Sequence, residues 1–342
     1  MQKELRHFAD QGWQGPIKTL YFGGGTPSIL TVSEIEVFVG QAAALFDLDP
    51  GAEITLEANP DDLTSDKIQE LALSSVNRLS VGIQSFDAEE LLWMNRAHTP
   101  VQALESLEAT ARLFPNYSLD LIYGIPGSSM QLWADNLEQA LHFKPPHISA
   151  YALTVEPRTA LSSFIAKGLS ADVDEGAAQE QFDHLVQTLS GAGYDHYEIS
   201  NFAQPGFYSR NNSAYWQGET YLGIGPAAHS FDGKRRWWNP SNNSLYIRAL
   251  DKGDIATEFE VLTPRDRYNE AVMTGLRSRW GVSLKKIEEE FGEVYKAYLL
   301  QQAAPYLHNQ FLFLDSETLY TSGKGKFLAD GIASDLFMIN LK

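Results

Sequence analysis

The sequence contains no cysteine in its 342 residues. This absence excludes disulfides, cysteine-ligated zinc, a cysteine nucleophile and a thiolate-held iron–sulfur cluster within these residues. Basic residues are also scarce, because 26 Lys and Arg stand against 44 Asp and Glu and give a formal net charge of −18. A charge of this sign argues against a nucleic-acid or anionic-membrane surface, since either needs a basic footprint.

Long apolar runs are missing as well. No run approaches the roughly 18 residues that a membrane-spanning helix needs. The first residues, MQKELRHFAD, lack the apolar stretch of a signal peptide. We therefore expect a cytoplasmic protein without a transmembrane segment. The sequence also has no GxSxG or HExxH motif, and its 8 histidines show no metal-ligand spacing, so no metal site is expected from them.

Five short β-rich apolar runs recur in the first half of the chain, and helical patterns separate them. The runs span residues 18–22, 53–57, 78–83, 118–123 and 147–153. The helical patterns span 33–46, 65–74, 101–113 and 130–143, the first of them opened by a capping box from Thr31 to Glu34. This alternation predicts βαβ units and a parallel sheet. A helix over about 2–11 has no strand before it, so we expect a barrel without its opening strand.

The character of the chain changes after about residue 195. Tyr197–Phe202 and Tyr221–Ser230 predict further strands, and Phe231–Trp238 predicts a hairpin that turns at Asp232-Gly233. From about Thr263 onward the patterns are helical until a short β pattern over 311–320. We therefore divide the chain into a partial barrel over 1–195, a β-rich extension over 196–255 and a small helical, winged-helix-like domain over 256–342.

A glycine triplet and several polar side chains follow the predicted strands. Ligands of α/β sheets and barrels bind at the carboxyl ends of the strands. Gly23-Gly24-Gly25-Thr26-Pro27 lets the backbone approach a ligand closely, although a tight structural turn explains it equally well. The polar side chains at strand ends are Glu57, Gln84, Arg96 and Asp120. Each alone is better explained by local hydrogen bonding, but together they favour a polar, zwitterionic ligand.

Two features of the later chain admit a functional and a structural interpretation. His229, in the segment GIGPAAHS, is interpreted as a satisfied core histidine, with a role in a ligand site as the alternative. Lys234-Arg235-Arg236-Trp237-Trp238 offers charge and stacking to a flat anionic ligand, but a solvated hairpin tip is the simpler interpretation.

Seven blocks of the sequence resemble one known family in order. They are GGGTPS (23–28), LEANPDDL (56–63), RLSVGIQSFD (78–87), LDLIYGIPG (119–127), ISAYALTVEP (148–157), YEISNFA (197–203) and YLGIGPAAHS (221–230). They resemble the radical S-adenosylmethionine family over nearly the whole chain, in the branch of oxygen-independent coproporphyrinogen III oxidases and the related heme chaperones. The resemblance implies an incomplete (β/α)6 TIM-like barrel that holds S-adenosylmethionine against a [4Fe–4S] cluster. In active members, the cofactor is cleaved to a radical that abstracts hydrogen from the substrate.

The resemblance also implies roles for individual residues. It implies that the methionine amino group is held by Gly24, Gly25 and Thr26. It implies that the nucleoside and the carboxylate are contacted by Glu57, Gln84, Arg96 and Asp120. The heme motif HNxxYW of the family is matched by Asn211-Asn212-Ser-Ala-Tyr215-Trp216. Because Asn211 replaces the histidine and an amide is a poor iron ligand, His229 or His196 is the alternative axial ligand.

The cluster motif of the family, CxxxCxxC, belongs upstream of the glycine triplet, and this chain begins after that place. We expect a cluster only if an upstream segment supplies those cysteines, and we expect no radical cleavage by these 342 residues alone. Within the family, the short version of the EISNFA…GIGPAAHS region, residues 197–230, resembles the heme chaperones more than the oxidases. The resemblance therefore implies a protein that binds heme or another porphyrin and passes it to hemoproteins. The alternatives are a coproporphyrinogen III oxidase and, last, a ligand-free barrel kept as an interaction module.

Overall fold

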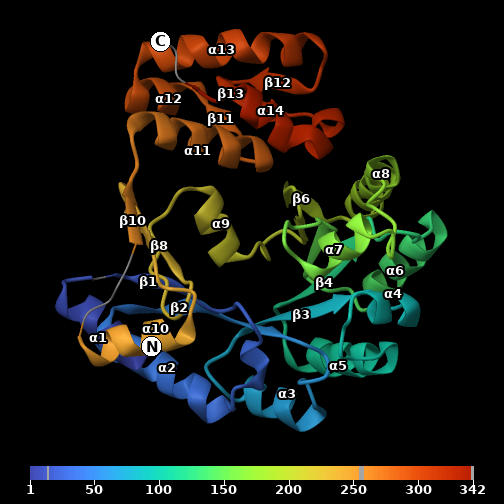
Figure 1. The fold of residues 1–342 in the computed structure, drawn as a ribbon, viewed down its shortest axis with the longest axis vertical. Coiled ribbons are helices and arrows are strands. Elements are labelled where there is room, and N and C mark those ends of the chain that lie inside the picture. Colours follow the sequence, from blue (N-terminus) through green and yellow to red (C-terminus); the bar gives the residue numbers. More distant parts are fainter. Residues whose placement is uncertain (14, 254–257, 340–342) are drawn as a thin grey trace. The chain divides into compact units, whose positions relative to one another are not determined.

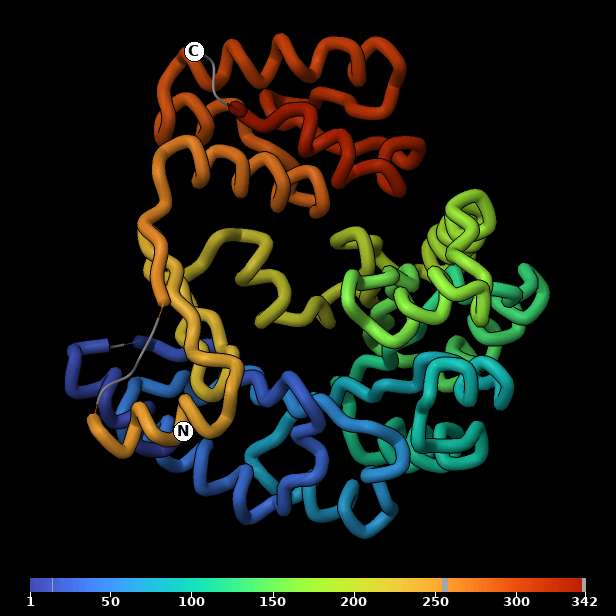
Figure 2. Tube along the Cα trace, in the orientation of Figure 1, coloured from blue at the N-terminus to red at the C-terminus, as the bar shows by residue number. Residues whose placement is uncertain are grey.

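The structure, a computed structural model, describes residues 1–13, 15–253 and 258–339. The chain divides into two compact units, which are described separately (Figure 2). The first, here called the barrel unit, contains residues 17–39 and 49–209. The second, here called the helical unit, contains residues 1–16, 40–48 and 210–342.

A curved seven-stranded sheet with the order β1-β2-β3-β4-β5-β7-β6 forms the barrel unit (Figure 1). Its strands are Ile17–Phe22 (β1), Leu48–Ala58 (β2), Arg78–Gln84 (β3), Tyr117–Tyr123 (β4), His147–Ala152 (β5), Asp195–Glu198 (β6) and Asn201–Ala203 (β7). Strands β2 to β5 are parallel, and β7 pairs antiparallel with both β5 and β6. The predicted α/β partial barrel is thereby confirmed.

One strand prediction in this sheet is wrong in detail. The single strand expected over 197–202 is instead the end of β6, a turn and the start of β7. The turn forms because the Glu198 carboxylate accepts a hydrogen bond from the backbone N–H of Ser200 at 3.1 Å. The chain reverses there, and β6 and β7 pair as a hairpin.

Helices separate the strands; four of them confirm the helical patterns predicted over 33–46, 65–74, 101–113 and 130–143, and three others in the described part of this unit were not predicted. They are Val32–Leu45 (α2), Ser65–Ala72 (α3), Ala88–Trp93 (α4), Pro100–Leu113 (α5), Met130–His142 (α6), Ala160–Ala166 (α7) and Glu175–Gly191 (α8), with a 3₁₀ turn over Pro27–Ile29. The predicted capping box at the start of α2 is present, since the Glu34 carboxylate accepts from the Thr31 N–H at 2.8 Å and the Thr31 hydroxyl accepts from the Glu34 N–H at 3.3 Å.

The two faces of the sheet differ in chemistry because side chains alternate along a strand. One face carries fully buried apolar residues, including Leu56, Leu79 and Leu119, and packs against the helices; α5 contacts β3 and α8 contacts β4. The other face carries polar residues in register, since Glu57 pairs with Ser80 of the next strand. The interior of the barrel is therefore polar, which is unusual for a packed core and typical of a ligand site.

The helical unit contains two small sheets. The first has the order β10-β9-β8 and consists of His229–Phe231 (β8), Arg235–Trp238 (β9) and Glu258–Val261 (β10). Its neighbours in the chain are Gln2–Asp10 (α1), Arg210–Trp216 (α9) and Asn243–Asp251 (α10). The predicted hairpin is confirmed, because β8 and β9 pair antiparallel and the Asp232 side chain accepts from the Lys234 and Arg235 N–H groups at 2.9 and 2.6 Å.

The strand predicted over Tyr221–Ser230 is wrong for most of its length. Only a bridge from Tyr221 to Phe231 and the start of β8 are extended. Gly225 has φ +116° and Ala227 has φ +59°, and neither value belongs to a strand. The segment between the Tyr221 bridge and Gly225 folds back toward His229. A Cβ at Gly223 would lie only 2.1 Å from the His229 carbonyl oxygen.

A buried carboxylate fixes this loop to the N-terminal helix. Glu4 of α1 is fully buried and accepts hydrogen bonds from Gly225 N–H at 2.9 Å, from Asn239 Nδ2 at 2.5 Å and from the Tyr246 hydroxyl. Because the carboxylate accepts these three hydrogen bonds, they offset the free-energy cost of removing it from water. Helix α1 is therefore bonded to the GIGPAAHS loop and to α10.

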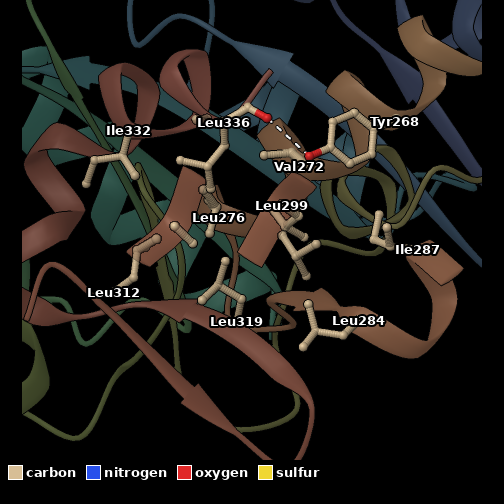
Figure 3. Packing of buried hydrophobic residues seen from close by; sticks show 13 residues of the cluster. Tyr268, Val272, Leu276, Leu284, Ile287, Leu299, Leu312, Leu319, Ile332 and Leu336 are labelled. Carbon is tan, nitrogen blue, oxygen red and sulfur yellow. Dashed lines mark hydrogen bonds between the residues drawn. The ribbon is translucent and has the colours of Figure 1, made fainter. Parts of the chain in front are cut away.

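The C-terminal part of the helical unit has its own core. Its helices are Pro264–Arg277 (α11), Leu284–Phe291 (α12), Glu293–His308 (α13), Ala329–Asp335 (α14) and the 3₁₀ helix Gly323–Leu328 (η2). Its strands, in the order β11-β13-β12, are Val282–Ser283, Thr318–Thr321 and Leu312–Asp315. Figure 3 shows Leu276, Leu299 and Leu319 converging in this core, with the Tyr268 hydroxyl donating to the Leu336 carbonyl at 3.1 Å. None of the helices in the described ranges is long and apolar enough to cross a bilayer.

Replacing the buried carboxylate tests how far the helical unit depends on it. We expect Glu4→Ala to lower the free energy of unfolding by about 3 kcal/mol, because the buried Gly225 N–H and Tyr246 hydroxyl lose their acceptor and the Asn239 amide keeps only its bond to the Gly225 carbonyl. The control is Lys3→Ala, which removes a neighbouring but exposed ion pair with Asp251 and should change stability by less than about 0.5 kcal/mol. Denaturant unfolding of both variants measures the difference, and equal effects would contradict the role assigned to Glu4.

Candidate functional site

The glycine triplet lies at the carboxyl end of β1 and has an open backbone. Gly24 and Gly25 have φ of +76° and +67°, which only glycine adopts without strain. A Cβ built on either residue would meet nothing within 4 Å, so the space beside both is open. Thr26 follows and precedes the 3₁₀ turn over Pro27–Ile29, accepting the Ile29 N–H at 3.2 Å. The turn therefore presents exposed backbone groups to an open space.

Glu57 at the end of β2 holds this turn in place. Its carboxylate accepts from the Tyr21 hydroxyl at 2.6 Å and from the Gly24 N–H at 3.1 Å. Gly23 must be glycine here, because a Cβ would lie 2.4 Å from the Tyr21 ring and 2.9 Å from a Glu57 oxygen. The Glu57 carboxylate thus stabilises the conformation of the glycine turn and lies directly beside it.

Gln84 and Arg96 meet beside a second glycine, Gly82. A Cβ at Gly82 would lie 2.8 Å from Gln84 Nε2 and 3.2 Å from Arg96 Nη2. The ladder shifts register between Val81 and Gln84, and Gln84 has φ +66°, so this bulge re-aims its side chain. Arg96 donates to Asn59 Oδ1 at 2.9 Å and more weakly to the Gly82 carbonyl at 3.3 Å.

Asp120 lies on the polar face of β4. It accepts hydrogen bonds from the Ser80 hydroxyl at 3.1 Å and from the Ser118 hydroxyl at 3.3 Å. Burial raises the pKa of Asp120 to about 6; hydrogen bonds from Ser149 and Ser80 oppose the rise, and the charge of Glu57 adds to it. Two carboxylates therefore act on each other across the barrel interior.

Arg96 supplies the positive charge of the same site. Burial lowers the pKa of Arg96, and the charges of Asp61 and Asp120 oppose that shift. The structure therefore brings the predicted strand-end residues to one polar rim: Glu57 and Asp120 interact electrostatically, as do Arg96 and Asp120. The prediction did not include Tyr21 or Asn59. The only available signal for Asn59 was its place directly after a strand.

The residues matched to the heme motif lie on helix α9 in the helical unit. Asn211 and Asn212 are in its first turn and are partly exposed. Tyr215 is 45% exposed and packs edge-to-face against Tyr221, with ring centres 4.5 Å apart. Trp216 lies under the Arg277 guanidinium, whose carbon is 5.1 Å from the ring centre.

His229 is exposed, so the favoured interpretation of a buried core histidine is wrong. The reason is the alternation of β8, in which Ser230 is buried and His229 points outward. Its ring stacks on Trp238 of β9, with centres 5.7 Å apart and planes at 26°. No hydrogen bond to its imidazole is present among the described residues. His196 differs, since it lies in the barrel unit, stacks on Phe202 at 4.1 Å and bonds with the Ile199 carbonyl at 3.1 Å.

The basic hairpin residues are largely engaged within the unit. Arg236 pairs with Glu270 at 2.8 Å and with Glu260 at 3.4 Å. Arg235 pairs with Asp232 at 2.8 Å. These pairs favour the structural interpretation of the basic segment over ligand binding by its arginines.

Comparison with known proteins identifies the class first. The model of the radical SAM superfamily matches residues 2–140, and that of the HemN C-terminal domain matches residues 262–328. The solved structure of coproporphyrinogen III oxidase (HemN) from Escherichia coli superposes with a TM-score of 0.83 at 22% identity, over 98% of this chain and 81% of that one. The chain thus has the fold of a radical SAM protein.

Curated relatives narrow the class to a family. The heme chaperone HemW of Lactococcus lactis is 34% identical, over 92% of this chain and 86% of the relative. The heme chaperone HemW of Bacillus subtilis is 30% identical, over 97% of this chain and 88% of the relative. The chain belongs to the HemW family within the radical SAM superfamily.

The raised pKa of Asp120 predicts a pH-dependent stability difference. Since its folded pKa of about 6 exceeds the unfolded value near 3.8, the wild type loses stability as pH rises from about 4 to 6, where the folded carboxyl must ionise. Asp120→Asn removes that loss. We expect the variant to match the wild type at low pH and to exceed it by about 3 kcal/mol above neutral pH, at about 1.36 kcal/mol for each unit of pKa difference.

Urea unfolding at several pH values measures this difference. The exposed Asp183 of α8 provides the control, because Asp183→Asn removes a charge that is already solvated. A stability difference for Asp120→Asn that stays constant over this pH range would contradict the assignment.

Proposed function

We propose that this protein is a heme chaperone: it binds heme in the helical unit and passes it to hemoproteins. The observation that carries the proposal is His229, an exposed imidazole stacked on Trp238 with no hydrogen bond in the part of the chain that the structure describes. A neutral imidazole is a good axial ligand of heme iron. Trp238 fixes the ring orientation, so little rotational freedom is lost when iron binds.

Names of relatives support the same proposal. The curated relatives with this architecture are called heme chaperones, and their match extends over nearly the whole chain. Asn211 stands where the family motif has histidine, so we propose that Asn211, Asn212, Tyr215 and Trp216 contact the porphyrin and that the iron ligand is His229. This assignment gives the ligand role to a side chain whose nitrogen can donate electrons to iron.

We further propose that the rim of the barrel unit holds S-adenosylmethionine. The open space beside Gly24 and Gly25 fits the close approach of an amino acid group. The paired charges of Glu57 and Asp120 favour a cationic ligand, and Arg96 is placed for a carboxylate. The cofactor would supply an activated sulfonium group at this rim.

The residues of this chain do not fit an iron–sulfur cluster. Such a cluster is held by cysteine thiolates, and the 342 residues include none. We therefore propose that these residues bind S-adenosylmethionine without cleaving it to a radical. The alternative activity, oxidative decarboxylation of coproporphyrinogen III, is supported by the fold shared with HemN and by the match to the HemN C-terminal domain.

Titration with hemin tests the heme site. We expect His229→Ala to weaken hemin binding by at least about tenfold and to remove the absorbance band of imidazole-ligated iron. His308→Ala is the matched control, since His308 is an exposed histidine of the same unit. Equal affinity and an unchanged spectrum in His229→Ala would contradict the ligand assignment.

Calorimetry with S-adenosylmethionine tests the rim. We expect Gly24→Ala to lower the affinity by about tenfold or more, because the methyl group enters the open space and the residue resists a positive φ. Gly12→Ala is a control for backbone strain alone: Gly12 has φ +84° and equally open surroundings, but it lies in the other unit. If both variants bind like the wild type, the proposed site is wrong.

A further inference from the structure

Three buried polar atoms lie close together where α9 meets α11. They are the hydroxyl of Ser213, the indole nitrogen of Trp216 and the Nε atom of Arg277, and none has a hydrogen-bond partner among residues 1–13, 15–253 and 258–339. Ser213 and Trp216 are three residues apart and share one side of α9. The Arg277 guanidinium covers the Trp216 ring at 5.1 Å. Buried polar atoms of proteins are nearly always paired, so three in one place require an explanation.

The chemistry of the three atoms specifies the missing partner. The indole N–H and the guanidinium N–H only donate hydrogen bonds, and the serine hydroxyl is able to donate. A group that accepts several hydrogen bonds and carries negative charge satisfies all of them. A carboxylate meets these requirements.

Arg277 already binds one carboxylate within the protein. Its Nη1 atom forms an ion pair with Asp330 of α14. The Arg277 side chain is 19% exposed, whereas that of Asp330 is 62% exposed, so the resident carboxylate occupies the outer edge of the guanidinium. A guanidinium has a second edge that includes Nε, and this edge is the one without a partner.

Two further basic residues lie close to Arg277 and Asp330 in the sequence of a chain whose net charge is −18. Arg279 follows Arg277 by two residues, and Lys326 precedes Asp330 by four. Burial and, to a smaller extent, the charge of Arg279 lower the pKa of Lys326 to about 8. At the site itself, the charge of the Arg277 guanidinium favours an anionic ligand over a cationic one.

We propose that Ser213, Trp216 and Arg277 form a binding site for a carboxylate and that this carboxylate is a propionate of the bound heme. The identity of the ligand rests on the proposed heme-binding function; the site itself rests on the unpaired donors. Arg277 receives the propionate through its Nε edge while Asp330 keeps the other edge. The propionate thereby anchors the porphyrin to α11 as well as to α9.

Hemin and hemin dimethyl ester, whose propionates are uncharged, distinguish the site from heme binding in general. We expect the full chain to bind hemin about tenfold more tightly than the ester. Arg277→Gln should abolish that preference by weakening hemin binding while leaving ester binding unchanged. Arg267→Gln is the matched control, because Arg267 lies on the same helix and also covers an aromatic ring, that of Phe291 at 5.5 Å.

A second variant should increase the affinity for hemin, and a misfolded protein would not show such an increase. Asp330→Asn removes the competing carboxylate, and it should strengthen hemin binding several-fold without affecting the ester. An unchanged hemin-to-ester ratio in Arg277→Gln, with wild-type heme affinity intact, would overturn the propionate site and leave the proposed function standing. Failure of the wild type to bind either porphyrin would contradict both.

Discussion

The hydrogen bonds of Glu57 are the interaction on which the barrel site depends. One carboxylate, at the end of β2, accepts from the Tyr21 hydroxyl and from the Gly24 N–H, and so joins two strand ends to the glycine turn. The turn has two consecutive residues with positive φ and no side chains to pack against neighbours. Without the carboxylate it would have little to define its shape. Glu57 therefore both orders the turn and places a negative charge next to it.

The parallel register extends this local arrangement across the barrel. Glu57 lies opposite Ser80, Ser80 lies opposite Ser118, and the serine hydroxyls donate to Asp120. The same face therefore gathers hydrogen-bond donors and two carboxylates in surroundings where burial makes charge costly. That cost is reflected in the raised pKa of Asp120. A cationic ligand would offset this cost, which supports the proposed binding of a sulfonium compound at the rim.

Much of this site follows from the sequence, because the ends of parallel strands share one edge of a sheet. Glu57 and Asp120 were predicted on that ground, and they interact. The role of Tyr21 was not predictable, because the sequence does not specify which residue of β1 lies beside Glu57 of the neighbouring strand β2. The bulge that turns Gln84 toward Gly82 also leaves no sequence signal, because it depends on a positive φ at a non-glycine residue. The loop before His229 was mistaken for a strand, as its conformation depends on the distant Glu4.

The helical unit carries a second set of groups suited to ligand binding. They are an exposed imidazole on β8 and buried hydrogen-bond donors without partners between α9 and α11. Together the two proposals have one chain bind heme and S-adenosylmethionine through different residues. Native mass spectrometry of the chain with both ligands tests this directly. We expect a complex that contains one heme and one S-adenosylmethionine per chain. Displacement of one ligand by the other, or the absence of any heme-bound species, would contradict it.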